Sequence, residues 1–174
     1  HLLFFAYQGT FAIITVALIS GAIADRARFS TWLIFAGIWT TLVYFPVAHW
    51  VFGGGWIFEM GAIDFAGGAV VHINAGAAAL ALCIVLGKRK GWPSKPMPPH
   101  SLPLTLLGTG MLWFGWAGFN AGSALGSGEL AAQALLNTFV AASAAMLGWL
   151  LIERIKDGHA TTLGAASGAV AGLV

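Results

Sequence analysis

Six long apolar stretches constrain the fold of this chain more than any other feature. They cover about 1–23, 31–52, 64–87, 102–123, 130–152 and 160–174. A helix needs roughly 20 predominantly apolar residues to cross the hydrocarbon core of a bilayer. Only 8% of the 174 residues are charged and 59% are hydrophobic, whereas soluble domains carry about 25% charged residues. We therefore predict an all-α, polytopic membrane helix bundle that forms a single transmembrane domain over 1–174.

The distribution of charge predicts how these stretches cross the membrane. All eight Lys and Arg residues fall in alternate connections: Arg26 and Arg28; Lys88, Arg89, Lys90 and Lys95; Arg154 and Lys156. In the connections between them, such as 53–63 and 124–129, the only charged residues are acidic. Basic connections usually face the cytoplasm, so we expect 53–63 and 124–129 to face outward. The buried core of a soluble protein would not sort its charges in this way.

Other compositional features exclude function classes. The net charge of +2 is too small to suggest nucleic-acid binding, and the single cysteine, Cys83, excludes an internal disulfide. No two histidines have metal-ligand spacing on one helix, so no metal site or cofactor is expected. His1 is followed at once by apolar sequence and Val174 still lies in an apolar run. We therefore expect a fragment of a longer protein.

The last stretch, "LGAASGAVAGLV", places three glycines four residues apart on one helix face. These are Gly164, Gly168 and Gly172. Small residues at this spacing allow membrane helices to approach closely, because lipid provides no hydrophobic drive for their association. The pattern predicts tight helix packing but does not indicate a function.

Polar and aromatic residues gather near the outer ends of the predicted spans. They are Phe52, Asp64, Phe119 and Ser123, with Tyr7 and Phe11 on one face of the first span and His72 deeper in the third. Aromatic faces attract a partly dehydrated cation, and ionisable groups at membrane depth are usually functional. We interpret the group as a cation mouth above a narrow apolar passage lined by His72, where Gly68 and Gly76 leave space.

Each of these residues also has a structural interpretation. His72 could be a core histidine hydrogen-bonded between helices, and Asp64 is well placed as a helix N-cap. Phe52 could belong to an interfacial aromatic belt. The rings of Phe11 and Phe119 could simply pack in the core. The Ser123 hydroxyl could simply bond its own helix backbone.

Four sequence blocks resemble the ammonium transporters of the Amt/Mep/Rh family. They are "YQGTFA", "YFPVAHWVFGGGW", "DFAGGAVVHINAG" and "FGWAGFNAGSA", and their order and spacing match along the whole chain. The resemblance implies a fold of about eleven helices with two inverted repeats, assembled as a homotrimer with one pore per subunit. This chain would cover the third span through the start of the eighth.

The resemblance also implies roles for individual residues. Phe11 and Phe119 resemble the stacked phenyl rings that gate the pore. Ser123 resembles the vestibule hydroxyl that bonds the arriving ammonium ion, and Asp64 resembles the acidic residue that organises the entrance. His72 resembles the first of two hydrogen-bonded pore histidines; its partner would come from a later span.

One further position, Phe52, departs from the family pattern. Phe52 stands where bacterial members usually carry tryptophan, and a phenyl ring attracts a cation more weakly than an indole.

The implied function is ammonium or ammonia transport, with methylammonium as a further substrate and no enzymatic activity. The implied location is multi-pass in the plasma membrane, typically a bacterial or archaeal inner membrane. A PII-type regulatory protein is an implied partner on the cytoplasmic side.

Three other functions are compatible with parts of the sequence. An ammonium sensor with the same fold would keep every feature described above. A channel for water or urea would keep His72 and the glycines but would not need an aromatic cation mouth. An intramembrane serine hydrolase would use "GAASGA", with Ser167 as nucleophile and His72 as base.

Overall fold

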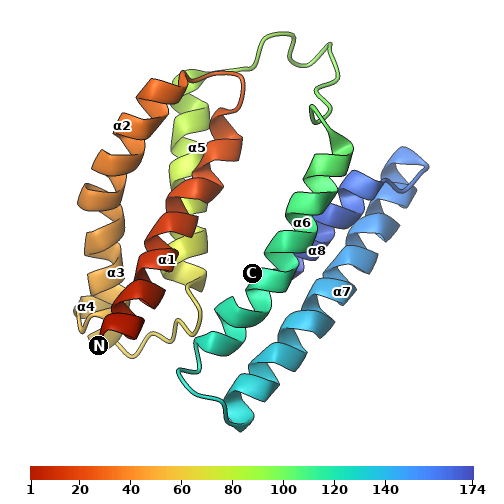
Figure 1. Ribbon diagram of the computed structural model, residues 1–174. Helices are drawn as coiled ribbons and strands as arrows, with labels where there is room; N and C mark the ends of the chain where they lie inside the picture. The colour runs from red at the N-terminus through yellow and green to blue at the C-terminus, as the bar shows by residue number, and fades with distance from the viewer. The chain divides into compact units, whose positions relative to one another are not determined.

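The computed structural model describes residues 1–174, which form helices joined by turns and loops, with no β-strand (Figure 1). In chain order the elements are α1 (Leu2–Ile19), η1 (Ser20–Ile23), α2 (Phe29–Trp39), η2 (Thr40–Tyr44), α3 (Phe45–Phe52), α4 (Trp56–Glu59), η3 (Gly68–Ile73), α5 (Asn74–Leu86), α6 (Leu102–Trp116), η4 (Ala117–Ala121), α7 (Glu129–Asp157) and α8 (Thr162–Leu173). The predicted all-α fold class is confirmed.

Five helical segments are long and apolar enough to cross a membrane. They are Leu2–Ile23, Phe29–Glu59, Gly68–Leu86, Leu102–Ala121 and Glu129–Asp157, and they fall on the first five predicted stretches. The sixth stretch contains α8, which has 12 residues where a full span needs roughly 20.

The third span begins later than the sequence predicts. Its helix starts at Gly68 rather than at Asp64. The cause is Gly67, whose φ of 95° lies in the left-handed region and interrupts a right-handed helix. Asp64 to Gly67 therefore form a turn that leads into the helix.

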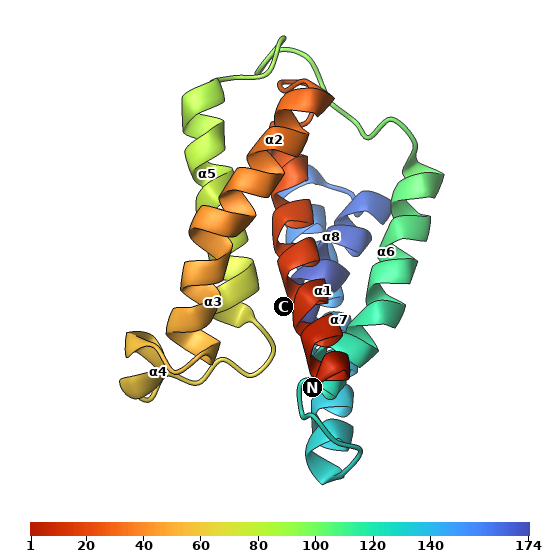
Figure 2. The ribbon, with the colours of Figure 1, turned by 60° about the vertical axis from the view of Figure 1, so that its left-hand side comes forward.

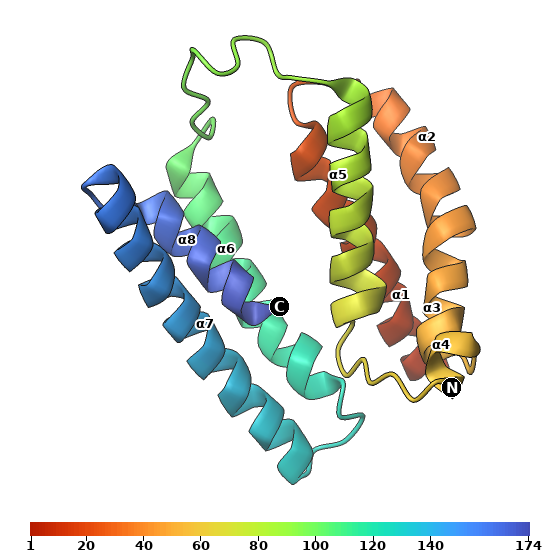
Figure 3. The ribbon, with the colours of Figure 1, turned by 180° about the vertical axis from the view of Figure 1, so that it is seen from behind.

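The helices divide into two compact units, His1–Pro96 and Met97–Val174. In the first unit, α1 packs beside α5 and contacts η2 and η3 (Figures 1 and 3). The core of this unit includes side chains that are at most 1% exposed: Phe11, Thr15, Ile19, Val70 and Val71. The aromatic face of α1 and the start of the third span are thus held in one packed body.

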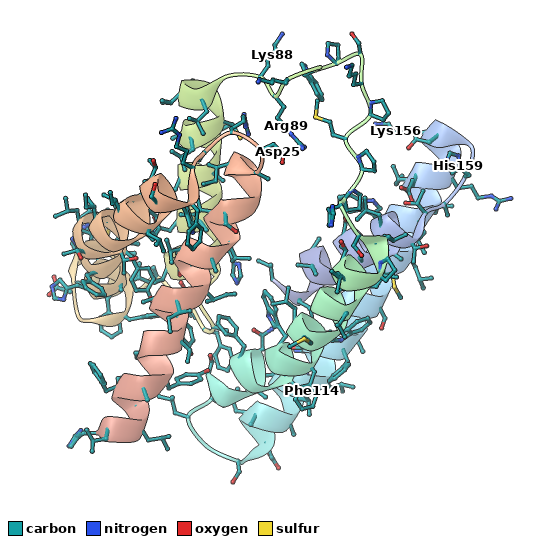
Figure 4. All side chains as sticks on the ribbon, turned by 45° about the horizontal axis from the view of Figure 1, so that its top comes forward. Asp25, Lys88, Arg89, Phe114, Lys156 and His159 are labelled. Carbon is teal, nitrogen blue, oxygen red and sulfur yellow. The ribbon has the colours of Figure 1, made fainter.

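A cluster of charged side chains ties together one end of this unit. The guanidinium of Arg26 donates hydrogen bonds to the carbonyls of Ala22 and Gly87, which lie at the ends of η1 and α5. Asp25 and Arg89 form an ion pair beside them (Figure 4). Carbonyls at helix C-termini have no partner within their helix and attract positive charge. Arg26 therefore fastens the ends of two helices to each other.

In the second unit, α8 packs along α7 and also contacts α6 (Figure 2). A Cβ added at Gly168 would lie 2.7 Å from the Trp149 Cβ and 2.8 Å from the Met146 Cα. One added at Gly172 would lie 2.6 Å from the Ala145 Cβ. Only glycine permits so close an approach, which confirms the tight packing predicted from the glycine spacing.

Candidate functional site

The first unit brings three aromatic rings together at the start of α1. Tyr7 and Phe11 lie one helical turn apart, and their ring centroids are 5.1 Å apart at an interplanar angle of 71°. The ring centroid of Phe52, the last residue of α3, lies 6.1 Å from that of Phe11, at an interplanar angle of 81°. Phe11 itself is 1% exposed. Edge-to-face contacts of this kind fix the orientation of the rings, and Tyr7 and Phe52 are only half-buried.

The Asp64 carboxylate receives three backbone N–H groups. Its Oδ1 accepts from Gly67 at 2.7 Å, and its Oδ2 accepts from Ala69 at 2.9 Å and from Val70 at 3.0 Å. These donors belong to the unpaired first turn of the third span, where a carboxylate also meets the positive end of the helix dipole. The N-cap residue is Gly67 and not Asp64 as predicted, but the Asp64 carboxylate caps the first turn from three residues earlier. The carboxylate thereby places a negative charge at the start of the helix that carries His72.

His72 lies in η3, a π-helical turn, and its ring is half-buried. Its backbone N–H donates to the Gly67 carbonyl at 3.1 Å, and the Val71 N–H donates to the same oxygen at 2.8 Å. Val70 and Val71, which precede His72, are 0% exposed. Single π turns often occur at functional sites, because the extra residue redirects the side chains of one turn. The turn presents a ring with one donor and one acceptor nitrogen in apolar surroundings.

Phe119 and Ser123 belong to the second unit. Phe119 lies in η4, a further π-helical turn, and packs against a buried cluster of Trp116, Ala142 and Leu173. Its ring centroid is 5.4 Å from that of Trp116. The Ser123 hydroxyl donates to the Phe119 carbonyl at 2.8 Å, as the simpler interpretation of this serine predicted. The two residues are therefore joined within one turn.

Two glycines that the sequence singled out lie in open surroundings. Nothing within the first unit comes within 4 Å of a Cβ built at Gly76, and a Cβ built at Gly68 meets only the Asp64 Oδ1, at 4.0 Å. Within this turn the glycine with close neighbours is Gly67, which the sequence did not single out. Its position between "DFA" and a second glycine gave no sign of which residue adopts the left-handed conformation.

Two further residues with a structural role were missed. Thr15 is 0% exposed and donates its hydroxyl to the Phe11 carbonyl at 2.6 Å. Asn120 donates its side-chain amide to the Thr138 hydroxyl at 3.0 Å and to the Leu173 carbonyl at 3.1 Å. A polar residue inside an apolar run was the available signal for both. Each hydrogen bond secures the backbone beside a candidate gate phenylalanine.

The serine hydrolase hypothesis does not agree with the local structure. Ser167 lies inside α8, and its hydroxyl donates to the Leu163 carbonyl at 2.9 Å. A nucleophilic serine requires an adjacent base and usually a sharp turn that exposes its oxygen. The "GAASGA" glycines serve helix packing instead. The structure contains no group of three or more His, Cys, Asp and Glu residues that could hold a metal ion.

Comparisons with known proteins identify relatives along the whole chain. The profile of the Ammonium Transporter Family matches residues 1–174. An ammonium transporter of Mycobacterium tuberculosis is 63% identical over 180 residues, which cover 98% of this chain and 38% of that protein. The crystal structure of Mep2 from Candida albicans superposes with a TM-score of 0.91 at 44% identity, covering 99% of this chain and 39% of that one.

A further solved structure is described as a sensor Amt protein. It has a TM-score of 0.90 at 33% identity and covers 98% of this chain and 45% of that one. The chain therefore spans about two fifths of the length of the proteins it matches.

Proposed function

The chain belongs to the ammonium transporter family, and from this premise we propose that the protein containing it transports ammonium or ammonia across a membrane. Methylammonium is proposed as a second substrate, because it carries the same charge on a slightly larger cation. The relatives named as transporters favour transport over sensing. The observation that carries the proposal is the contact of Phe11 with both Tyr7 and Phe52, beside the Asp64 turn that leads to His72.

The first step is recruitment of the cation at the outer mouth. In the first unit Phe52, half-buried beside the buried Phe11, attracts the positive charge. The family resemblance adds Phe11 and the Ser123 hydroxyl of the second unit, the latter as a hydrogen-bond acceptor. The Asp64 carboxylate is occupied by three backbone donors, so its contribution is to fix the turn and to add a negative field. A cation–π contribution is about 0.5–1 kcal/mol at an exposed site and about 2 kcal/mol when the cation is desolvated. Such a mouth prefers ammonium to a neutral solute.

The second step is deprotonation, followed by passage of the neutral molecule. Ammonium transfers one proton to water at the mouth and becomes ammonia, and the proton then crosses by a separate polar route. Ammonia then moves past the gate rings, Phe11 and Phe119, into the passage lined by His72. Apolar walls reject a bare cation, because desolvating a charge costs far more than desolvating a small neutral amine. His72 can accept a hydrogen bond from the passing molecule or donate one to it.

The proposal extends to assembly and location. Basic connections on the cytoplasmic side place the aromatic mouth outside, in a plasma membrane such as a bacterial or archaeal inner membrane. The functional unit is a homotrimer, and a PII-type regulatory protein docks on the cytoplasmic connections. The basic segment 88–95 faces that side in the proposed orientation.

Uptake of labelled methylammonium by proteoliposomes containing the full-length protein tests this function. We expect saturable uptake that excess ammonium suppresses and that urea does not. Suppression by urea would indicate a neutral-solute channel instead. Binding of ammonium by folded protein without any uptake would contradict transport and indicate a sensor.

A further inference from the structure

Gly67 connects three of the candidate site residues through contacts of different kinds. Its N–H donates to the Asp64 carboxylate at 2.7 Å. Its carbonyl accepts the N–H groups of both Val71 and His72, at 2.8 and 3.1 Å. A Cβ built on it would lie 3.3 Å from the Phe11 Cε1. Gly67 is thus bonded to the entrance carboxylate and to the histidine turn, and a side chain on it would meet the edge of the gate ring.

The surroundings of Gly67 leave no room for a side chain. The added Cβ would lie 2.8 Å from the Val71 Cγ2, and both Val71 and Phe11 are at most 1% exposed. In a close-packed interior neither neighbour can move aside without displacing others. The φ of 95° further restricts the position to glycine.

We propose that Gly67 is the positioning residue that sets the Phe11 ring against the turn carrying His72. The inference rests on the proposed function in assigning Phe11 to the gate and His72 to the passage. A methyl group at Gly67 would push the Phe11 ring away from this turn and would strain the carbonyl that holds His72. Recruitment and passage would then change together, although Gly67 itself contacts no substrate.

The chain offers two matched controls. Gly61 has a φ of 82°, and nothing lies within 4 Å of a Cβ built on it, so Gly61→Ala introduces the same backbone strain without a collision. Gly68 adjoins Gly67 and has no positive φ. The nearest atom to its added Cβ, the Asp64 Oδ1, lies 4.0 Å away, so Gly68→Ala tests a methyl group in the same turn.

The first measurement is ¹⁹F NMR of the full-length protein with 3-fluorophenylalanine at position 11, which places the label at the ring edge beside Gly67. We expect Gly67→Ala to shift this resonance by more than its line width, whereas Gly61→Ala and Gly68→Ala leave it in place. An unchanged resonance in Gly67→Ala would overturn the inference, as would an equal shift in Gly61→Ala. This readout does not depend on transport.

The second measurement is concentration-dependent methylammonium uptake by the same proteins. The collision of the added Cβ with Val71 and Phe11 is absent at Gly61, and overpacking a filled interior has a cost that corresponds to about a tenfold change in a rate or an affinity. We expect Gly67→Ala to raise the half-saturation concentration and to lower the maximal rate, each about tenfold, while Gly61→Ala, which lies outside the proposed passage, stays within about twofold. A fall in maximal rate alone would indicate loss of folded protein and would overturn the positioning role.

The two measurements separate the failures of the two proposals. If the resonance shifts in Gly67→Ala but the parent protein shows no uptake, transport is contradicted and the positioning of Phe11 still holds. If Gly67→Ala does not fold, the double variant Gly67→Ala, Val71→Ala removes the Val71 Cγ2 collision and keeps the approach to Phe11. The ¹⁹F shift must then persist in the double variant, and its absence would overturn the inference.

Discussion

Replacing Asp64 tests whether one carboxylate organises the start of the third span. The carboxylate uses both oxygens, with Gly67 on Oδ1 and with Ala69 and Val70 on Oδ2. Asp64→Asn retains a single acceptor oxygen. At best this oxygen replaces Oδ2 and only the bond to Gly67 is lost. Asp64→Ala loses all three bonds and leaves the buried donors of Gly67 and Val70 unsatisfied.

The hydrogen bonds give the expected magnitudes. A hydrogen bond to a charged group contributes about 1.5–3 kcal/mol, and a buried donor left unsatisfied costs about 1–3 kcal/mol. We therefore expect the local opening free energy to fall by about 2 kcal/mol in Asp64→Asn and by about 4 kcal/mol in Asp64→Ala. At 1.4 kcal/mol per factor of ten, these values correspond to about 30-fold and about 700-fold faster amide exchange.

Hydrogen–deuterium exchange of the full-length protein in detergent measures these changes residue by residue. The amide of Gly67 should lose protection in both variants, and the amides of Ala69 and Val70 should lose more protection in Asp64→Ala than in Asp64→Asn, while the amides of α7 remain unchanged. Glu59→Ala is the control, because Glu59 is an exposed acid in the same connection. Equal exchange in Asp64→Ala and the parent would refute the clamp, and a similar loss in Glu59→Ala would assign it to general electrostatics.

Two further changes test the mouth and the packing of the second unit. Phe52→Trp should lower the half-saturation concentration for methylammonium about threefold, because indole binds cations more strongly than phenyl; an unchanged value in concentration-dependent uptake would show that Phe52 does not face the cation. Gly168→Ala should lower the free energy of unfolding in detergent by about 2 kcal/mol, because its Cβ would meet the Met146 backbone at 2.8 Å. Gly148→Ala, with nothing within 4 Å, is the matched control, and an equal loss there would contradict the packing argument.

The spans could be predicted because they depend on continuous apolar composition and on segregated charge. Asp64 ahead of an apolar run predicted a helix cap, and the spacing of Tyr7 and Phe11 predicted that they share one face of their helix. The late start at Gly68 could not be predicted, because "DFAGG" has two glycines and only the fold decides which one becomes left-handed. The π turns that carry His72 and Phe119 were also missed, because one extra residue in a turn leaves no trace in an apolar sequence.

The contacts between helices depended on information outside local sequence. Phe11 and Phe52 are 41 positions apart, and no periodicity relates them; the family resemblance suggested that they act together. The residues alone singled out His72 but also allowed an ordinary core histidine, and the resemblance favoured the pore. It did not indicate Thr15 or Gly67, whose importance arises from a buried hydroxyl and from a close approach that only the packed structure reveals.

Charge movement in proteoliposomes after an ammonium pulse tests the central proposal most directly. The full-length protein is compared with His72→Ala and Phe119→Ala, with incorporation and folding verified for each. The proposal predicts a saturable current in the parent that both substitutions alter. Folded protein that shows neither current nor isotope uptake would contradict ammonium transport, and a current unaffected by either substitution would contradict the assignment of His72 and Phe119 to the pore.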